Sequence, residues 1–227
     1  FFGEEKVDLI AQKSLRTNLS DMAAMGATPW VYTLSLSLGP VTKGTLDQWV
    51  ASFVKGLKKD QDKYDVGLIG GDTVTGSGPT VVSITILGRA DPRGVITRNG
   101  ASVYDDIYVS GTMGDSAAGL KIIQEPVNDL AHSEQSYLKE RYYLPNPRVK
   151  LGKGLVGIAS AAMDVSDGLI QDLGHLCSAS SLGAIVKWPM LPLSKAVEQL
   201  LNKKTIPTSL IVNGGDDYEL LFTAPER

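Results

Sequence analysis

The sequence of 227 residues lacks several features that would assign it quickly to a class of protein. It contains one cysteine, Cys177, so no internal disulfide can form, which fits a reducing compartment. No apolar run approaches the ~18 residues that a membrane helix needs, and no basic-then-apolar leader is present. We therefore expect a cytoplasmic protein with no membrane segment and no export signal.

The sequence also has no large excess of basic or of acidic residues. Lys and Arg number 22 against 25 Asp and Glu, which gives a net charge of −3. Neither half is basic enough to indicate a nucleic-acid partner. The two histidines, His132 and His175, are far apart in the sequence and offer no structural zinc site. The remaining candidates for chemistry are carboxylates and glycines.

Standard phosphate-binding motifs are absent as well. The sequence has no G-x-x-x-x-G-K-[ST], no complete G-x-G-x-x-G and no protein-kinase catalytic loop. Gly76-Ser77-Gly78 begins like a dinucleotide loop, but Val81 occupies the place of the third glycine. With 43% hydrophobic and 21% charged residues the chain is nevertheless typical of a globular protein with a sizeable core.

The first ~90 residues predict mixed helices and strands. A helix that Asp8 can cap should end at Gly26, and a second should span 45–57 with a Thr45/Gln48 capping box. Alternating apolar residues predict strands over 32–38 and 82–86, and the apolar run 66–69 predicts a short buried strand. Because hairpin-like and crossover connections mix, we expect an α+β fold.

The turn cluster 91–94 is the best candidate for a domain boundary, which predicts domains 1–93 and 94–227. A short strand over 95–97 and another over 107–109 should open the second domain. Helices and strands then alternate, which predicts an α/β domain with a mixed sheet covered by helices: helix 147–160, strand 161–165, helix 169–177 and strand 184–188.

Carboxylates gather where predicted elements end: Asp21, Asp72 after Gly70-Gly71, Asp164 and Asp167 beside Gly168, and Asp216 after Gly214-Gly215. One by one they also fit a solvated helix residue or turn residues, and Arg98 also fits a surface arginine. Together they indicate a site where cations offset the repulsion between carboxylates. A ligand set of carboxylate oxygens without His or Cys favours Mg²⁺. Mg²⁺ held by aspartates is what a phosphoryl-transfer site needs when the sequence has no Walker lysine to neutralise the phosphates.

The motifs, and the order in which they occur, resemble those of the bacterial thiamine-monophosphate kinase family. This family belongs to a superfamily with aminoimidazole ribonucleotide synthetase and selenophosphate synthetase. The blocks that carry the resemblance cover nearly the whole chain: Asn18 to Ala27, Ile69 to Thr73, Thr97 to Ala101, Val109 to Leu120, Asp164 to Leu169 and Gly214 to Leu220.

The resemblance implies a two-domain PurM-like fold and a homodimer. The N-terminal domain would bind ATP and form a β-barrel shared with its copy. The reaction would transfer the γ-phosphoryl group of ATP to thiamine monophosphate. Relative to the family, domain 1–93 would be truncated at its N-terminus and domain 94–227 at its C-terminus, where the family has further metal ligands, a substrate histidine and an aromatic residue.

The resemblance also implies roles for residues. No side chain would act as a nucleophile or base, because the acceptor is already an ionised phosphate. Several Mg²⁺ ions would be held by Asp21, Asp72, Asp164 and Asp167. ATP would contact Gly71, Asp72, Arg98 and Ser166, and Asp216 would lie beside thiamine monophosphate. The alternatives are another ATP-using enzyme of the superfamily, such as a selenophosphate or purine-pathway synthetase, or a catalytically silent nucleotide-binding dimer.

Overall fold

The computed structural model describes residues 6–41, 43–128 and 130–226. The chain divides into two compact units: unit 1 comprises residues 1–19 and 28–89, and unit 2 comprises residues 20–27 and 90–227. Helix α1 (Val7–Ala24) thus contributes most of its length to unit 1 and its last residues to unit 2. In the described ranges, none of the helices combines the length and apolar character that crossing a membrane requires.

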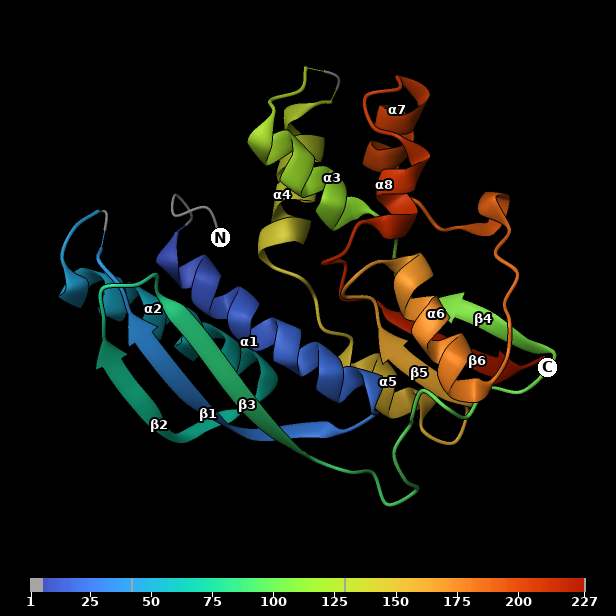
Figure 1. Ribbon diagram of the computed structural model, residues 1–227, viewed down its shortest axis with the longest axis horizontal. Helices are drawn as coiled ribbons and strands as arrows, with labels where there is room; N and C mark the ends of the chain where they lie inside the picture. The colour runs from blue at the N-terminus through green and yellow to red at the C-terminus, as the bar shows by residue number, and fades with distance from the viewer. Residues whose placement is uncertain (1–5, 42, 129, 227) are drawn as a thin grey trace. The chain divides into compact units, whose positions relative to one another are not determined.

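Unit 1 is built on a three-stranded mixed sheet. Strand β1 (Thr28–Leu38) lies between β2 (Gly67–Thr75), which runs parallel to it, and β3 (Val81–Arg89), which runs antiparallel (Figure 1). A parallel pair needs a crossover, and helix α2 (Leu46–Tyr64) supplies it. The expected α+β character is confirmed.

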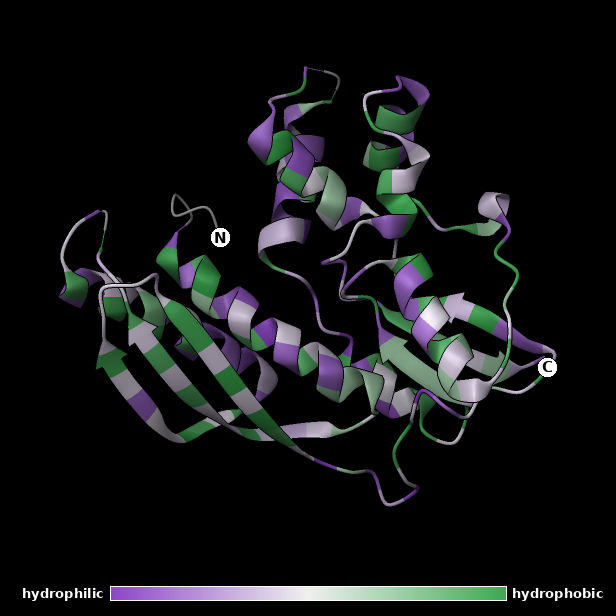
Figure 2. Cartoon of the chain, viewed as in Figure 1, coloured by the Kyte–Doolittle hydropathy of each residue, from purple (hydrophilic) through white to green (hydrophobic). Residues whose placement is uncertain are grey.

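One face of this sheet carries the core of unit 1. Val82, Ile84 and Ile86 of β3 are half-buried while the residues between them are exposed, so the strand has two distinct faces. Figure 2 shows this alternation of hydrophobic and hydrophilic residues along the strands. The half-buried residues pack against a cluster from both helices, β1 and the residue before β2: Ala11, Leu15, Leu19, Tyr32, Phe53, Leu57 and Val66.

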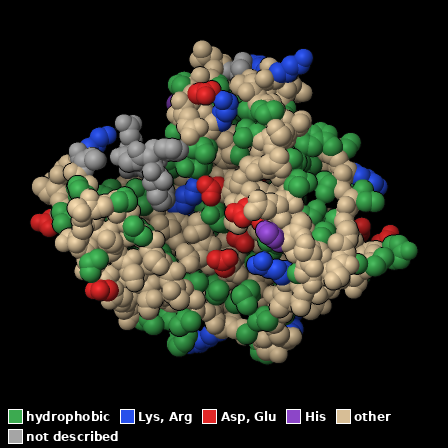
Figure 3. Space-filling model, viewed as in Figure 1, with side chains coloured by type: hydrophobic (Ala, Val, Ile, Leu, Met, Phe, Trp, Pro, Cys, Tyr) green, Lys and Arg blue, Asp and Glu red, His purple; other side chains and the backbone are tan. Residues whose placement is uncertain are grey.

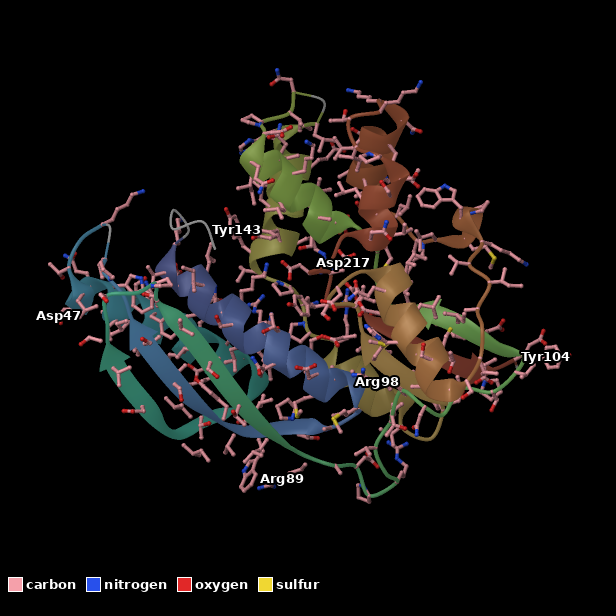
Figure 4. The ribbon with its side chains drawn as sticks, viewed as in Figure 1. Asp47, Arg89, Arg98, Tyr104, Tyr143 and Asp217 are labelled. Atoms are coloured by element: carbon pink, nitrogen blue, oxygen red, sulfur yellow. The ribbon has the colours of Figure 1, made fainter. Side chains whose placement is uncertain are left out.

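The opposite face of the sheet is open in this chain. Val74 and Val81 flank Ser37 of β1 in the strand register and are 52% and 54% exposed. Figure 3 shows hydrophobic side chains standing out over the strands of unit 1. At the other end of β3, the guanidinium of Arg89, labelled in Figure 4, stacks 4.5 Å from the ring centre of Trp30, itself 49% exposed.

Two expectations for unit 1 need correction. Helix α2 begins at the predicted Thr45/Gln48 capping box but continues to Tyr64 rather than ending at 57. Its last turns are polar and hold together through helix propensity and side-chain pairs, so the apolar stripe stops before the helix does. The predicted buried strand 66–69 is in fact β2, which begins at Gly67, extends to Thr75 and is exposed at the edge of the sheet. Val66 is buried as expected but precedes the strand.

A buried ion pair joins α1 to α2. Arg16 Nε donates to Asp60 Oδ2 at 2.6 Å and Arg16 Nη2 to Asp60 Oδ1 at 2.9 Å, with both side chains almost completely buried. We expect Asp60→Ala to lower the free energy of unfolding by about 3–5 kcal/mol, because the buried Arg16 guanidinium loses the carboxylate that accepts two of its hydrogen bonds. Urea unfolding followed by circular dichroism measures this.

Asp62→Asn is the matched control, since Asp62 pairs with Lys58 on the same helix but both side chains are more than 60% exposed. That substitution should change stability little. Equal effects of the two substitutions would contradict a special contribution from the buried pair.

Unit 2 contains a second three-stranded sheet, in the order β4 (Asp105–Val109), β6 (Leu220–Pro225), β5 (Ala161–Asp164). Both pairings are antiparallel, so among the strands of the described ranges this sheet differs from the mixed one expected for this part. The βα rhythm suggested parallel neighbours, but the central strand comes from the end of the described chain and runs opposite to both others. The predicted strands 95–97 and 184–188 are irregular, apart from the 3₁₀ turn η1 (Trp188–Met190).

Six helices accompany this sheet within the described ranges. They are α3 (Asp115–Gln124), α4 (His132–Tyr143), α5 (Val149–Leu155), α6 (Leu169–Ser180), α7 (Lys195–Asn202) and α8 (Thr208–Asn213). Helix α5 is shorter than the predicted 147–160. Helix α6 packs through Leu169, Leu173 and Leu176 into a core with Met163 of β5 and Leu221 of β6. This packing fixes the chain segments at the carboxyl end of β5.

Candidate active site

The predicted site residues fall in both units. Gly71 and Asp72 lie in β2 of unit 1. The others belong to unit 2: Asp21 near the end of α1, Arg98 in the segment before β4, Asp164 at the end of β5, Ser166 and Asp167 in the turn that follows, and Asp216 in the segment before β6. Arg98 and Asp217 are labelled in Figure 4.

The turn after β5 is interlocked with the segment before β6. The backbone N–H groups of Asp216 and Tyr218 donate to the carbonyls of Ser166 and Val165, each at 2.8 Å. A Cβ on Gly215 would lie 2.3 Å from the Ser166 carbonyl oxygen, so only glycine permits this approach. Two glycine–aspartate segments that are distant in the sequence therefore form one rigid acidic loop pair.

Asp164 is the most perturbed carboxyl among the predicted site residues. Its side chain is 8% exposed, and burial raises its pKa to about 6, with a further upward contribution from the charge of Asp21. The buried hydroxyl of Ser20, which makes no hydrogen bond of good geometry, favours the charged form of Asp164. Desolvation also raises the pKa of Asp21, while Arg98 lowers it. Asp21, Asp164 and Arg98 thus interact electrostatically.

Tyr218 is part of this group, although nothing in its local pattern selects it beyond its place next to two aspartates. Its pKa is raised, first by burial and then by the charge of Asp216, to which its hydroxyl hydrogen-bonds. Asp164 and Asp21 contribute in the same direction. The phenol of Tyr218 therefore interacts electrostatically with three carboxylates, which come from α1, the end of β5 and the segment before β6.

The donor set fits Mg²⁺ better than a softer metal. Among the described residues, no three His, Cys, Asp or Glu side chains stand close enough to hold a metal without other ligands. The charges of Asp21 and Asp164 nevertheless repel each other, so a cation between them would relieve an unfavourable arrangement. Mg²⁺ takes one or two carboxylates and completes its shell with water and phosphate oxygens.

In unit 1, the structure gives Gly71 a role that differs from the expectation. We expected the glycine before Asp72 to let a ligand approach the backbone. Its φ is +149°, and a Cβ there would lie 1.8 Å from the Leu34 carbonyl oxygen, so the close neighbour is strand β1. Asp72 itself is exposed on the open face of the sheet, opposite Ser35 in the strand register.

Sequence reasoning missed a buried ionic network beside the loop pair. Glu219 accepts from Arg148 at two 2.6 Å contacts and from Arg141 at 2.8 Å, and Ser110 donates to it at 2.5 Å. Both arginines occur in ordinary helical or pre-helical sequence, so only their partner in space identifies them.

Asp217 has a structural task in this network. It accepts the N–H groups of Gly114 and Ser116 at 2.6 and 3.1 Å and thereby caps helix α3. Burial raises the pKa of Asp217 to about 7, although these hydrogen bonds and Arg141 oppose the shift. The two neighbouring aspartates, Asp216 and Asp217, therefore serve different purposes.

Comparisons with known proteins agree with this architecture. Residues 1–90 match the family described as AIR synthase related protein, N-terminal domain. Thiamine-monophosphate kinase of Escherichia coli O157:H7 is 42% identical over 220 residues, which cover 96% of this chain and 65% of that protein. The crystal structure of thiamine-monophosphate kinase from Stenotrophomonas maltophilia K279a is 40% identical, with a TM-score of 0.88, over 98% of this chain and 69% of that one.

The chain belongs to the thiamine-monophosphate kinase family. The resemblance noted from the order of the motifs is confirmed, and with it the PurM-like fold. A further member of this family, AaThiL complexed with AMPPCP and TMP, is 29% identical with a TM-score of 0.89 and covers 99% of this chain and 71% of that one. The chain spans 65% of the length of its curated E. coli relative.

Proposed function

We propose that the protein transfers the γ-phosphoryl group of ATP to thiamine monophosphate, giving thiamine diphosphate and ADP. The observation that carries the proposal, in a member of this family, is the interlocked acidic loop pair, where Tyr218 interacts electrostatically with Asp216, Asp164 and Asp21. The bond from the γ-phosphorus to the β,γ-bridging oxygen breaks while a bond to a phosphate oxygen of the acceptor forms. That oxygen is already ionised, so no proton is removed and no side chain serves as nucleophile.

The proposed roles of individual residues are those that the family resemblance implies. Asp21, Asp72, Asp164 and Asp167 hold several Mg²⁺ ions. Bound Mg²⁺ would neutralise the two polyanionic substrates and the charge that develops on the transferred group. Gly71, Asp72, Arg98 and Ser166 are the residues proposed to contact ATP. Asp216 lies beside the thiamine monophosphate.

The same proposal divides the chain into an ATP-binding and dimerisation domain, 1–93, and a C-terminal domain, 94–227. The open face of the unit 1 sheet supports a homodimer with a shared β-barrel, because Val74 and Val81 would leave solvent there. A cytoplasmic location is part of the proposal and fits the single cysteine.

Asp72→Asn tests the proposal most directly. Asp72 is exposed, and its side chain accepts the N–H of the adjacent Thr73 at 2.9 Å, so the fold should tolerate the change within about 0.5 kcal/mol. Loss of a metal-binding charge should lower kcat by at least about a hundredfold. Product formation from ATP and thiamine monophosphate, read by mass spectrometry, measures it.

Asp47→Asn is the control, since Asp47 is an exposed carboxylate in the same unit at the first turn of α2 (Figure 4). It should keep wild-type kinetics. An unchanged kcat in Asp72→Asn would remove Asp72 from the metal site. Wild-type protein that phosphorylates a different acceptor, or none, would refute the proposed function.

A further inference from the structure

Asp172, on the first turns of α6, lies outside every role assigned so far. Its side chain is 1% exposed, and its Oδ2 atom accepts three consecutive backbone N–H groups, those of Ser166, Asp167 and Gly168, at 3.0, 3.1 and 3.1 Å. Three N–H groups converging on one oxygen form the kind of concave site that usually binds an anion. Here a carboxylate of the chain itself occupies it.

The usual N-terminal cap of this helix is missing. Gly168 stands at the cap position with φ +125° and has no side chain to accept a hydrogen bond. A Cβ at this position would lie 2.8 Å from backbone atoms of Asn213, so a capping Ser or Asp would not fit there. Asp172 therefore reaches back from inside the helix to the residues in front of it.

The position of the three N–H groups gives this contact its significance. They belong to the turn that presents Ser166 and Asp167, and the carbonyl of Ser166 is in turn the anchor for Asp216. Gln171, on the same helix, donates to Asp167 Oδ2 at 3.0 Å and fixes that side chain from the other side. Without Asp172 the turn would keep the Asp216 anchor but lose the three bonds that set its curvature.

We propose that Asp172 is a positioning residue: it holds the turn 166–168 in the shape that presents Ser166 to ATP and Asp167 to Mg²⁺. This inference rests on the proposed function for the ligands, whereas the shape of the turn is a property of the chain alone. Asp172 makes no contact with substrate in this scheme and acts through the backbone of the turn.

Asp172→Asn tests the inference, because asparagine keeps the size of the side chain but removes the charge that three donors share. We expect the amides of residues 166–168 to exchange hydrogen at least about tenfold faster, as local opening becomes easier. We also expect the affinity for AMPPCP in the presence of Mg²⁺, measured by calorimetry, to fall about tenfold or more, as when a residue that orients metal ligands is lost. KM for ATP and the Mg²⁺ concentration for half-maximal rate should rise more than kcat falls.

Glu198→Gln is the matched control, since Glu198 is an exposed carboxylate in the first turn of α7. Glu198→Gln removes one negative charge from the first turn of a helix without altering the turn 166–168. It should leave amide exchange, AMPPCP affinity and the kinetic constants unchanged. Asp172→Ser, which retains a short acceptor, replaces the asparagine variant if circular dichroism shows that the latter does not fold.

The outcomes separate the two proposals. A folded variant with unchanged amide exchange and unchanged AMPPCP affinity overturns the inference. A lower melting temperature with unchanged AMPPCP affinity of the folded protein also overturns it, because Asp172 would then be a helix cap only. Wild-type protein that fails to bind AMPPCP with Mg²⁺ refutes the proposed function, and amide exchange still decides whether Asp172 shapes the turn.

Discussion

Replacing Asp164 by asparagine should make the metal-free protein more stable at pH 7 while lowering turnover by at least about a hundredfold. The two effects have opposite signs because the buried carboxylate is unfavourable for folding but is proposed to bind Mg²⁺. Burial and the charge of Asp21 raise the pKa of Asp164 to about 6 in the folded protein. The expected gain in the free energy of unfolding is about 1–2 kcal/mol at pH 7.

The pH dependence of stability gives the sign of the effect of Asp164→Asn on the free energy of unfolding. The folded protein binds a proton at Asp164 between the unfolded pKa of 3.8 and the folded value of about 6, so wild-type stability falls as the pH rises through this range. The asparagine variant should not lose stability over this pH range, because it has no carboxyl group at this position. The two proteins should therefore unfold at similar urea concentrations at pH 4 and diverge by pH 7.

Adding Mg²⁺ with AMPPCP should make the wild type more stable than the Asp164→Asn variant, since a ligand that binds only the folded wild type stabilises it by mass action. Asp106→Asn is the control, because Asp106 is exposed on β4 of the same unit. It should follow wild type at each pH. A variant of Asp164 that is less stable than wild type at pH 7 without metal would contradict the account of its burial.

Replacing Glu219 by glutamine should lower the free energy of unfolding by about 3–5 kcal/mol, a large share of the stability of a typical domain. Glu219 is buried and accepts from Arg148, Arg141 and Ser110. Glutamine fills the same volume but removes the buried negative charge that both guanidinium groups contact. Guanidinium chloride or urea unfolding, with the slope compared to wild type, measures the effect.

The loss should extend to the active site. Glu219 is three residues from Asp216, and its backbone carbonyl accepts from Val165 at 2.8 Å, so the network anchors one side of the loop pair. AMPPCP affinity should therefore fall together with stability. Glu125→Gln is the control: it removes a mostly exposed carboxylate that pairs with Lys121 and should change stability little. An equally small effect at Glu219 would refute the importance of the network.

Much of the fold was predictable where local chemistry decides it. The capping box of Thr45 and Gln48 placed the start of α2, and the alternation along 82–86 placed β3 and its buried face. The prediction of a strand over 184–188 was wrong, because a short apolar run occurs in irregular segments as well as in strands. The antiparallel order of the unit 2 sheet depends on long-range pairing, which no local pattern encodes.

The candidate site divides in the same way. Glycine next to aspartate marked the turns, and Asp164, Asp167 and Asp216 do lie on interlocked segments. The partners that hold these segments were not predictable, since Asp172 and Glu219 are ordinary residues in their own elements. Their importance comes from three N–H groups and two guanidinium groups that meet them only in the folded chain.

The interlocked loop pair has a consequence for biosynthesis. Val165 and Glu219 are 54 positions apart, so a ribosome must add more than fifty residues after the β5 turn before its partner segment exists. During that interval the turn has neither the Asp216 anchor nor the central strand of its sheet. The nascent sheet of unit 2 is therefore expected to stay open and vulnerable to proteases until β6 emerges, and to close cooperatively once it has.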